Sequence, residues 1–242
     1  MKPLEMKPIL MLAGGFGSRL KSVVPDVPKP LAPVCGRPFI IHLIENLIYQ
    51  GAREMVILLH YQSDLIQTVI SEYIAREYMH TVSVTFVVEE IPFGTGGSIS
   101  NAVRSLKISD TFLVINSDTW LGNGLKDINV SSPNSIATIE VADCSRYGSV
   151  IIEGNEIKRF VEKGKVYGGG LINAGLYHLN IDLFSNFFDV SNFSLENDVF
   201  PLAVENGILK AIEINTDFID IGIPEDYFRF CDWIHTDKKN AL

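Results

Sequence analysis

Residues 9–20 read Ile9-Leu10-Met11-Leu12-Ala13-Gly14-Gly15-Phe16-Gly17-Ser18-Arg19-Leu20, an apolar run that ends in a glycine-rich loop. The continuous run Ile9–Ala13 is typical of a strand that is buried on both faces of a parallel sheet. Ligands bind at the carboxyl ends of such strands, where glycines let backbone N–H groups approach phosphates closely. The stretch therefore predicts a central strand followed by a phosphate-binding loop, although an ordinary glycine-rich turn has the same composition.

Outward from this stretch, the first half of the chain alternates between strand-like and helix-like apolar spacing. We expect strands at Met55–Leu59, Val82–Val88 and Thr111–Ile115, and helices at Pro38–Gln50, Asp64–Tyr78 and Thr95–Leu106. Strands that alternate with helices predict right-handed βαβ units and parallel pairing. The fold class that we expect is α/β, with a Rossmann-like, mostly parallel central sheet and helices on both faces.

The second half is less regular and suggests a smaller antiparallel portion. We expect strands at Ser135–Val141, Val150–Ile152, Ile157–Phe160, Leu171–Leu179 and Lys210–Ile214, and helices at Ile181–Phe188, Leu195–Glu205 and Pro224–His235. The turn residues Glu153-Gly154-Asn155 predict a hairpin, and residues 236–242 are expected to be frayed. Because the sequence contains no repeat, low-complexity segment or linker, we expect residues 1–242 to form one domain.

Composition limits the classes of function. The net charge of −9 disfavours binding to nucleic acid or to an anionic membrane, so an anionic substrate needs a local cationic pocket. The three cysteines form no CxxC pair, which favours a reducing cytoplasm over a disulfide framework. Apolar runs are too short for a signal peptide or a membrane span. We therefore expect a cytoplasmic protein.

Two cations accompany the glycine-rich loop. Arg19 lies within it, and Lys29 follows between two prolines, which stiffen the backbone around it. The pattern GxxxxGK[ST] is absent, and the third glycine of GxGxxG would fall at Leu20, which disfavours a dinucleotide-dependent oxidoreductase. Cations held beside a glycine loop suit a triphosphate, although Lys29 taken alone is also compatible with a solvated loop lysine.

Two aspartates occupy comparable positions at apolar strands. Asp118 follows the apolar run Phe112–Ile115 closely, and Asp220 lies between Ile219 and Ile221. A buried carboxylate is costly without a partner. A structural partner and a metal ion are both compatible with each aspartate, since carboxylate oxygens are preferred ligands of Mg²⁺.

Six segments resemble, in order, the motifs of the sugar-phosphate nucleotidyltransferase family. The segments are LAGGFGSRL with PKPL (residues 12–20 and 28–31), EEIPFGTGG (89–97), NSD (116–118), FVEK (160–163), NAG (173–175) and FIDIGIPEDY (218–227). Each is weak alone, but six in the right order over about 220 residues are specific. Within the family, the pattern is most similar to the bacterial D-glycero-α-D-manno-heptose 1-phosphate guanylyltransferases.

The resemblance implies a role for each matching residue. It implies catalytic roles for Arg19, Lys29, Asp118 and Asp220, nucleotide contacts for Leu12, Gly14, Gly15, Glu89 and Gly94, and sugar-phosphate contacts for Gly148, Glu162, Lys163 and Asn173. Asp118 and Asp220 are the implied Mg²⁺ ligands. The implied reaction joins a nucleoside triphosphate to a sugar 1-phosphate and releases pyrophosphate, with residues 6–120 as a nucleotide-binding half and residues 121–235 as a sugar-binding half. A homo-oligomer is compatible with the sequence.

The choice of base depends on Glu89. The thymidylyltransferase relatives have glutamine at this position, whereas a carboxylate accepts both neighbouring donors of guanine. We therefore expect GTP rather than UTP, dTTP or CTP. The resemblance separately implies a heptose 1-phosphate rather than mannose or glucose 1-phosphate. Two alternatives stay open: Glu89 and Glu90 as solvated charges at a strand end, and a non-catalytic nucleotide-sugar binding subunit on the same fold.

Overall fold

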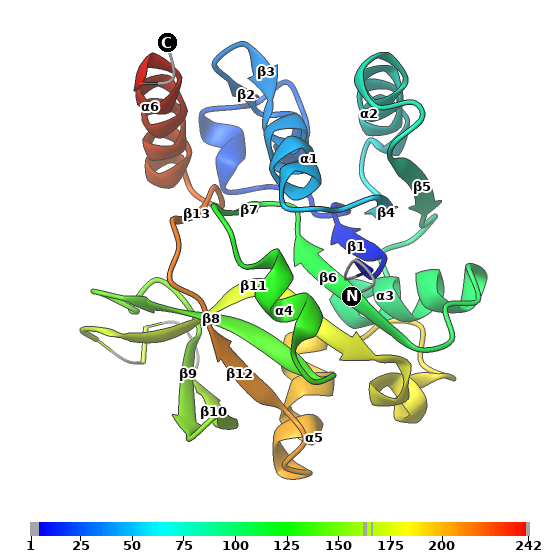
Figure 1. Ribbon diagram of the computed structural model, residues 1–242, viewed down its shortest axis with the longest axis vertical. Coiled ribbons are helices and arrows are strands. Elements are labelled where there is room, and N and C mark those ends of the chain that lie inside the picture. Colours follow the sequence, from blue (N-terminus) through cyan, green and yellow to red (C-terminus); the bar gives the residue numbers. More distant parts are fainter. Residues whose placement is uncertain (1–4, 162–163, 166, 241–242) are drawn as a thin grey trace.

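The computed structural model describes residues 5–161, 164–165 and 167–240, without the side chains of residues 237–240. Within these residues one nine-stranded sheet has the order β5-β4-β1-β6-β11-β8-β12-β10-β9 (Figure 1). Its first part consists of β1 (Ile9–Leu12), β4 (Glu54–Leu59), β5 (Ser83–Val88) and β6 (Thr111–Asn116). These four strands pair in parallel, as their alternation with helices predicted.

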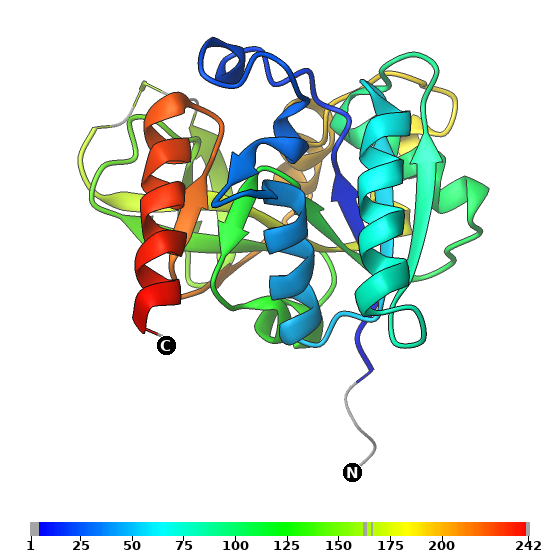
Figure 2. The same cartoon turned by 90° about the horizontal axis from the view of Figure 1, so that it is seen from above.

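Helices cover both faces of the sheet, which confirms the predicted α/β class. The relevant helices are α1 (Phe39–Tyr49), α2 (Ser63–Glu77), α3 (Gly94–Ser105), α5 (Phe200–Glu205) and α6 (Pro224–Asn240). Figure 2 shows α1, α2 and α6 side by side on one face. Ile9 and Met11 belong to the core on that side, whereas Leu10 belongs to the core under α3 and α5. Two cores therefore account for the continuous apolar run of the first strand.

The antiparallel strands of the second half extend the same sheet. They are β8 (Ser135–Val141), β9 (Ser149–Glu153), β10 (Glu156–Val161) and β11 (Gly170–Asn180), with β12 (Lys210–Glu213) beside β8. β11 pairs antiparallel with both β6 and β8, and thereby joins the two halves. β12 pairs in parallel with β8. The site residues of both halves consequently stand on one continuous support.

The three helices predicted in the last third of the chain are helical in the structure but differ in type or length from the prediction. The segment Ile181–Phe187 is a 3₁₀-helix, and Leu195–Val199 is a π turn that precedes α5. Pro201 has no N–H to donate to the carbonyl four residues earlier, which favours the wider turn before it. The last helix continues to Asn240 instead of fraying after His235, because no glycine or proline interrupts it.

Several short elements complete the fold, and of these the sequence indicated only the apolar strand at Asp220. They are β7 (Thr119–Leu121), α4 (Leu125–Val130), β13 (Phe218–Asp220) and the hairpin of β2 (Pro33–Val34) with β3 (Arg37–Pro38). β7 and β13 pair antiparallel, with Asp220 opposite Thr119. This small ladder brings the segments after β6 and before α6 together, although about 100 residues separate them.

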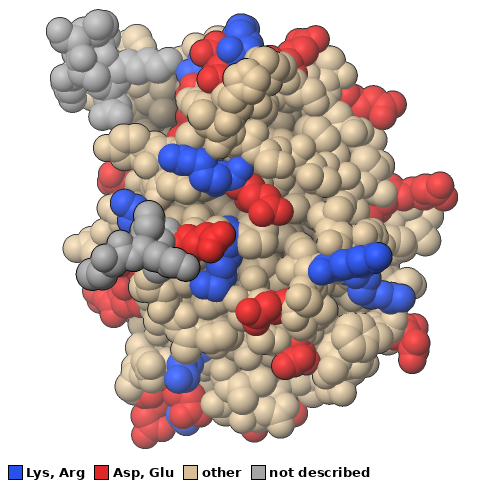
Figure 3. Space-filling model, turned by 45° about the vertical axis from the view of Figure 1, so that its right-hand side comes forward, with Lys and Arg blue, Asp and Glu red and all other residues tan. Residues whose placement is uncertain are grey.

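The surface offers no broad basic area on the side that Figure 3 shows. Lys and Arg side chains there are interspersed with Asp and Glu side chains among uncharged residues. An anion approaching this face would therefore meet separate cationic positions. In the described part of the chain, none of the helices combines the length and the apolar character that crossing a membrane requires.

Candidate functional site

Two cavities meet at Asp118. The first, which we call the glycine-loop cavity, measures about 340 Å³, and the second, which we call the β11 cavity, measures about 530 Å³. Leu12, Gly14, Gly15, Glu89 and Gly94 line the glycine-loop cavity, whereas Arg19, Gly148, Asn173 and Asp220 line the β11 cavity. Asp118 lines both, together with Asn116 and Glu196. The structure therefore places the expected nucleotide residues on one side of Asp118, and most of the other expected residues on the opposite side.

Lys29 bonds directly to Asp118. Its Nζ donates to Asp118 Oδ2 at 2.6 Å, and the lysine side chain is only 12% exposed. Burial raises the pKa of the Asp118 carboxyl, but the charge and hydrogen bond of Lys29 outweigh burial and hold that pKa below its usual value. The solvated-lysine alternative is therefore wrong, and the pair supplies one fixed cation and one ionised carboxylate.

The glycine-rich loop fixes the position of this lysine. Lys29 opens a 3₁₀ turn, Lys29–Leu31, whose N-cap is Pro28. Gly17 has φ +59°, and a Cβ there would lie 2.6 Å from the Cβ of Lys29. Only glycine combines this backbone conformation with so close an approach. The loop that carries Arg19 is thus packed against the chain that carries Lys29.

Asp220 reaches the same place through the β7–β13 ladder. The N–H of Ile221 donates to the carbonyl of Asp118 at 2.9 Å, so the two aspartates stand on adjoining backbones. Asp220 Oδ1 accepts a hydrogen bond from the N–H of Gly222 at 2.7 Å. Both carboxylates offer oxygen ligands of the kind that Mg²⁺ prefers.

The two carboxylates fit a metal ion that takes only some of its ligands from the protein. No cluster of three or more His, Cys, Asp or Glu side chains is placed to hold a metal in the described ranges of the chain. Mg²⁺ typically takes one or two carboxylates and completes its shell with water and substrate phosphates. Asp118 and Asp220 match that pattern, in contrast to an all-protein metal cage.

Glu89 has a buried carboxylate, and only one of its two oxygens accepts a hydrogen bond in the described structure. It is 6% exposed, and its Oε2 accepts a hydrogen bond from the N–H of Phe93 at 3.1 Å. His60 Nδ1 donates to the backbone carbonyl of Glu89 at 2.9 Å, which fixes the backbone of Glu89 at the cavity wall. Oε1 is buried and has no hydrogen-bond partner in the described structure. The solvated-charge alternative fits the exposed Glu90 but not Glu89.

Gly94 begins α3 at the same wall, one residue before the range Thr95–Leu106 that the apolar spacing predicted. It has φ +72°, and a Cβ there would lie 2.6 Å from the carbonyl oxygen of Phe193. Glycine is therefore required where the start of α3 meets the segment before the π turn. The N–H groups of Gly96 and Gly97 in this first turn donate to the carbonyl of Phe193, at 3.0 and 3.2 Å, so the start of α3 is held in place at the end of the glycine-loop cavity. The helix dipole is positive there.

Polar side chains of β11 line the other cavity. Asn173 Nδ2 donates to the hydroxyl of Tyr177 at 3.1 Å, and Asn173 Oδ1 accepts from the N–H of Gly175 at 2.9 Å. Burial, and then the negative charge of Glu196, raises the pKa of Tyr177, so its hydroxyl stays protonated. The carbonyl of Gly148 accepts from the N–H of Asn173 at 3.3 Å. The wall thus presents neutral hydrogen-bonding groups that suit sugar hydroxyls.

The expected sugar-phosphate pair, Glu162 and Lys163, lies outside the described residues. β10 ends at the preceding residue, Val161, and both Phe160 and Val161 line the β11 cavity. The strand therefore leads from the cavity wall directly into this pair. Their contacts remain an expectation from the sequence.

Sequence reasoning missed Glu196 and Tyr177. Glu196 lines both cavities, yet in the sequence Ser194-Leu195-Glu196 reads as an ordinary helix start. Its partner Thr95 is 101 residues away, with the Thr95 hydroxyl 2.7 Å from Glu196 Oε2. Tyr177 has the apolar spacing of a core strand. Local sequence patterns carry no signal for either contact.

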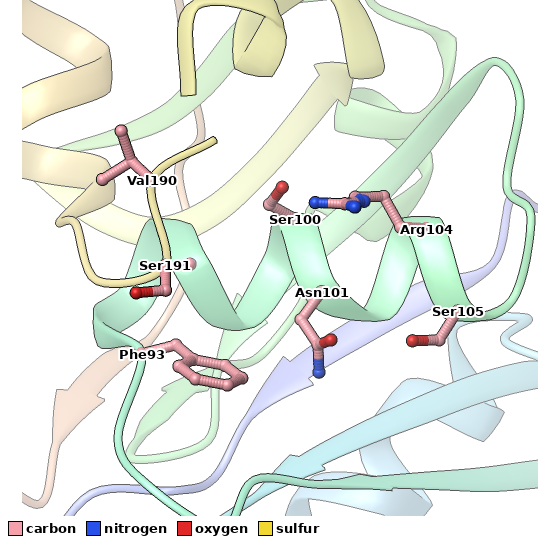
Figure 4. A pocket seen from close by; sticks show the side chains of 8 residues that line it. Phe93, Ser100, Asn101, Arg104, Ser105, Val190 and Ser191 are labelled. Carbon is pink, nitrogen blue, oxygen red and sulfur yellow. The ribbon is translucent and has the colours of Figure 1, made fainter. Parts of the chain in front are cut away.

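A further hollow of about 450 Å³ lies along α3, away from these residues. Figure 4 shows Ser100 and Arg104 on one side of the helix and Asn101 on the other, with Phe93 and Ser191 at its beginning. It shares no lining residue with either cavity around Asp118. None of the predicted site residues lines it, so we assign the candidate site to the two cavities instead.

The chain is similar to known proteins over most of its length. The family model described as nucleotidyl transferase matches residues 7–236. HddC from Yersinia pseudotuberculosis, in a crystal structure complexed with GMP-PN, is 36% identical and has a TM-score of 0.81, covering 95% of this chain and 100% of that chain. The D-glycero-alpha-D-manno-heptose 1-phosphate guanylyltransferase of Campylobacter jejuni subsp. jejuni is 32% identical over 222 residues, or 91% of this chain and 97% of that protein.

A longer relative shares the same region. The mannose-1-phosphate guanyltransferase of Eremothecium gossypii is 34% identical over 227 residues, which are 90% of this chain but 62% of that protein. The chain thus spans less than two thirds of that relative's length.

Proposed function

Because the chain belongs to the nucleotidyl transferase family, we propose that it transfers GMP from GTP to a sugar 1-phosphate and releases pyrophosphate. The observation that carries the proposal is the meeting of two cavities at the Lys29–Asp118 pair. A nucleotide in one cavity and a sugar phosphate in the other would place their phosphates at this junction. Similarity to the Campylobacter jejuni enzyme supports D-glycero-α-D-manno-heptose 1-phosphate as the acceptor, and similarity to the Eremothecium gossypii enzyme supports mannose 1-phosphate as the alternative.

The reaction needs charge neutralisation more than proton transfer. A phosphate oxygen of the sugar 1-phosphate attacks the α-phosphorus of GTP in line with the departing pyrophosphate. This oxygen is already ionised near neutral pH, since the second pKa of a phosphomonoester is about 6. No general base is therefore required. Positioning and electrostatic stabilisation supply the catalysis.

Three cations would divide this work. Arg19, which lines the β11 cavity beside Asp118, would hold the β- and γ-phosphates as pyrophosphate departs. Lys29 is held at the junction by Asp118 and would reduce the repulsion between the two anions. Lys163 would bind the incoming sugar phosphate. Gly14 and Gly15 would bring backbone N–H groups close to the nucleotide phosphates.

Asp118 and Asp220 would hold Mg²⁺. Their oxygen donors and their placement on adjoining backbones support this assignment. When bound, the ion would supply Lewis-acid stabilisation of phosphoryl oxygens. The presence of Arg19, Lys29, Asp118 and Asp220 together favours an enzyme over a non-catalytic binding subunit. The continuous nine-stranded sheet supports residues 1–242 acting as one unit.

We expect wild-type protein to prefer GTP over UTP and dTTP by at least about 10-fold in kcat/KM, the worth of one good polar contact. The free Oε1 of Glu89 is a buried acceptor in the glycine-loop cavity, and an ionised carboxylate can accept both the ring N–H and the exocyclic N2–H₂ of guanine. In Glu89→Gln the N–H of Phe93 retains the amide oxygen, which turns the NH₂ toward the base. The preference should therefore narrow, as measured by pyrophosphate release with each nucleotide.

Glu90→Gln is the matched control, because Glu90 is the exposed neighbour of Glu89. It should keep the full preference for GTP. If Glu89→Gln also keeps that preference, the guanine assignment stands but Glu89 is not its cause. Faster turnover with UTP or dTTP in the wild type contradicts both the assignment and its explanation.

A further inference from the structure

Glu196 is held rigidly at the junction of the two cavities. Its Oε2 accepts hydrogen bonds from the hydroxyls of Thr95, at 2.7 Å, and Ser194, at 3.0 Å. The Thr95 oxygen itself accepts from the N–H of Leu195 at 2.8 Å, and the Ser194 oxygen accepts from the N–H of Asn197 at 3.1 Å. Both hydroxyls therefore turn their protons toward Glu196. The side chain is fixed from α3 and from the π turn at once.

The second oxygen of this carboxylate is free to bind something else. Glu196 is half-buried, and Oε1 has no hydrogen-bond partner in the ranges that the structure describes. The residue lies within the π turn Leu195–Val199, a kind of turn that often occurs at functional sites. A fixed carboxylate with one unused oxygen is a preorganised acceptor. Among ligand groups, it matches a neutral donor.

The position of Glu196 indicates which donor this is. Phosphate groups would be repelled by the carboxylate, and the base end of the glycine-loop cavity already has its acceptor in Glu89. In the β11 cavity Glu196 stands with Asn173, Asn197 and Tyr177, which are all neutral and polar. Its charge acts on the buried Tyr177 hydroxyl, to which Asn173 donates. Glu196 therefore faces the cavity that we assign to the sugar.

We propose that Glu196 accepts a hydrogen bond from a ring hydroxyl of the sugar 1-phosphate and helps to determine which sugar the enzyme accepts. This inference rests on the proposed function of the β11 cavity. The π turn before α5 would then have a function, because it positions Glu196 to contact the sugar ring. Asp118 and Lys29 act on the phosphates, whereas Glu196 acts on a part of the substrate that does not react.

Glu196→Gln is the sharpest variant, because Thr95 and Ser194 still donate to the amide oxygen. The amide NH₂ then faces the substrate, and a donor replaces the acceptor without loss of packing. We expect KM for the sugar 1-phosphate to rise about 10- to 100-fold, as for a lost charge-assisted contact, with KM for GTP within about 2-fold of wild type. Glu205→Gln, on the exposed side of α5, is the matched control and should change neither constant.

Monodeoxy analogues of the best sugar 1-phosphate identify the hydroxyl. One analogue should be as poor for the wild type as the parent sugar is for Glu196→Gln, and the two losses should not add. An unchanged KM for the sugar phosphate in Glu196→Gln overturns the assignment. A rise in KM for GTP that disappears with 2′-deoxy- or 3′-deoxy-GTP overturns it as well, because the hydroxyl would then belong to the ribose.

Calorimetric titration separates this inference from the proposed reaction. The same sugar 1-phosphates are titrated into wild-type and Glu196→Gln protein without nucleotide. Binding that is at least about 10-fold weaker in the variant supports the role of Glu196 even if the wild type shows no turnover. Equal affinities, or an absence of binding to the wild type, overturn that role, whereas the reaction itself is judged separately by the formation of GDP-sugar.

Discussion

Replacing either Asp118 or Asp220 by asparagine should lower kcat by at least about 100-fold, because each change removes charge that stabilises the transition state by several kcal/mol. The fold should survive. An asparagine oxygen at position 118 still accepts from Lys29, and one at position 220 still accepts from the N–H of Gly222. Steady-state kinetics at saturating Mg²⁺ measures the loss, and thermal unfolding checks the fold.

Asp217→Asn is the control for these variants. Asp217 is exposed, lies three residues before Asp220 and lines neither cavity at Asp118. Its kcat should equal that of the wild type. Near-normal turnover in Asp118→Asn or Asp220→Asn would remove that residue from the metal site. A large fall in melting temperature would instead assign it a structural role.

Lys163→Ala should raise KM for the sugar 1-phosphate about 10- to 150-fold, which corresponds to a lost charge-assisted contact of roughly 1.5–3 kcal/mol. Its KM for GTP should change far less. The reason is the direction of β10, which ends at Val161 on the wall of the β11 cavity. The chain continues from there into Glu162 and Lys163. Initial rates with each substrate varied in turn give both constants.

Lys126→Ala is a suitable control, because Lys126 is exposed on α4 and lines neither cavity. It should leave both KM values unchanged. Equal increases of the two KM values in Lys163→Ala would show that Lys163 serves the triphosphate instead. In that case the roles that we assign to Lys29 and Lys163 would need to be exchanged.

The parallel half of the fold could be predicted because its signals are local. The apolar run Ile9–Ala13 is buried on both faces, and the helix that follows Gly94 begins there. The β7–β13 ladder could not be predicted in the same way. Each of its strands has three residues, and their pairing depends on a long-range contact rather than on spacing. The π turn likewise depends on how the chain passes Pro201 while packing against α3.

The candidate site shows the same contrast between local sequence signals and long-range contacts. Lys29 and Asp118 lie in recognisable segments, but only the structure places them 2.6 Å apart. The burial of Glu89 was not evident from two consecutive glutamates, since Glu90 is exposed whereas Glu89 is buried and accepts a hydrogen bond from the N–H of Phe93. Glu196 lacks a local signal because its position depends on a hydrogen bond from Thr95, which lies on a different element. Residue types can be predicted from motifs, whereas partners across the sheet cannot.

The most direct test of the proposed activity is product formation by the wild-type protein. Purified protein is incubated with Mg²⁺, GTP and D-glycero-α-D-manno-heptose 1-phosphate, with mannose 1-phosphate in a parallel reaction. Pyrophosphate is quantified and the nucleotide products are identified by mass spectrometry. The proposal predicts one GDP-sugar formed for each pyrophosphate released, and none without the sugar phosphate. An absence of GDP-sugar with every sugar 1-phosphate tried, at enzyme concentrations that give full binding of GTP, would contradict it.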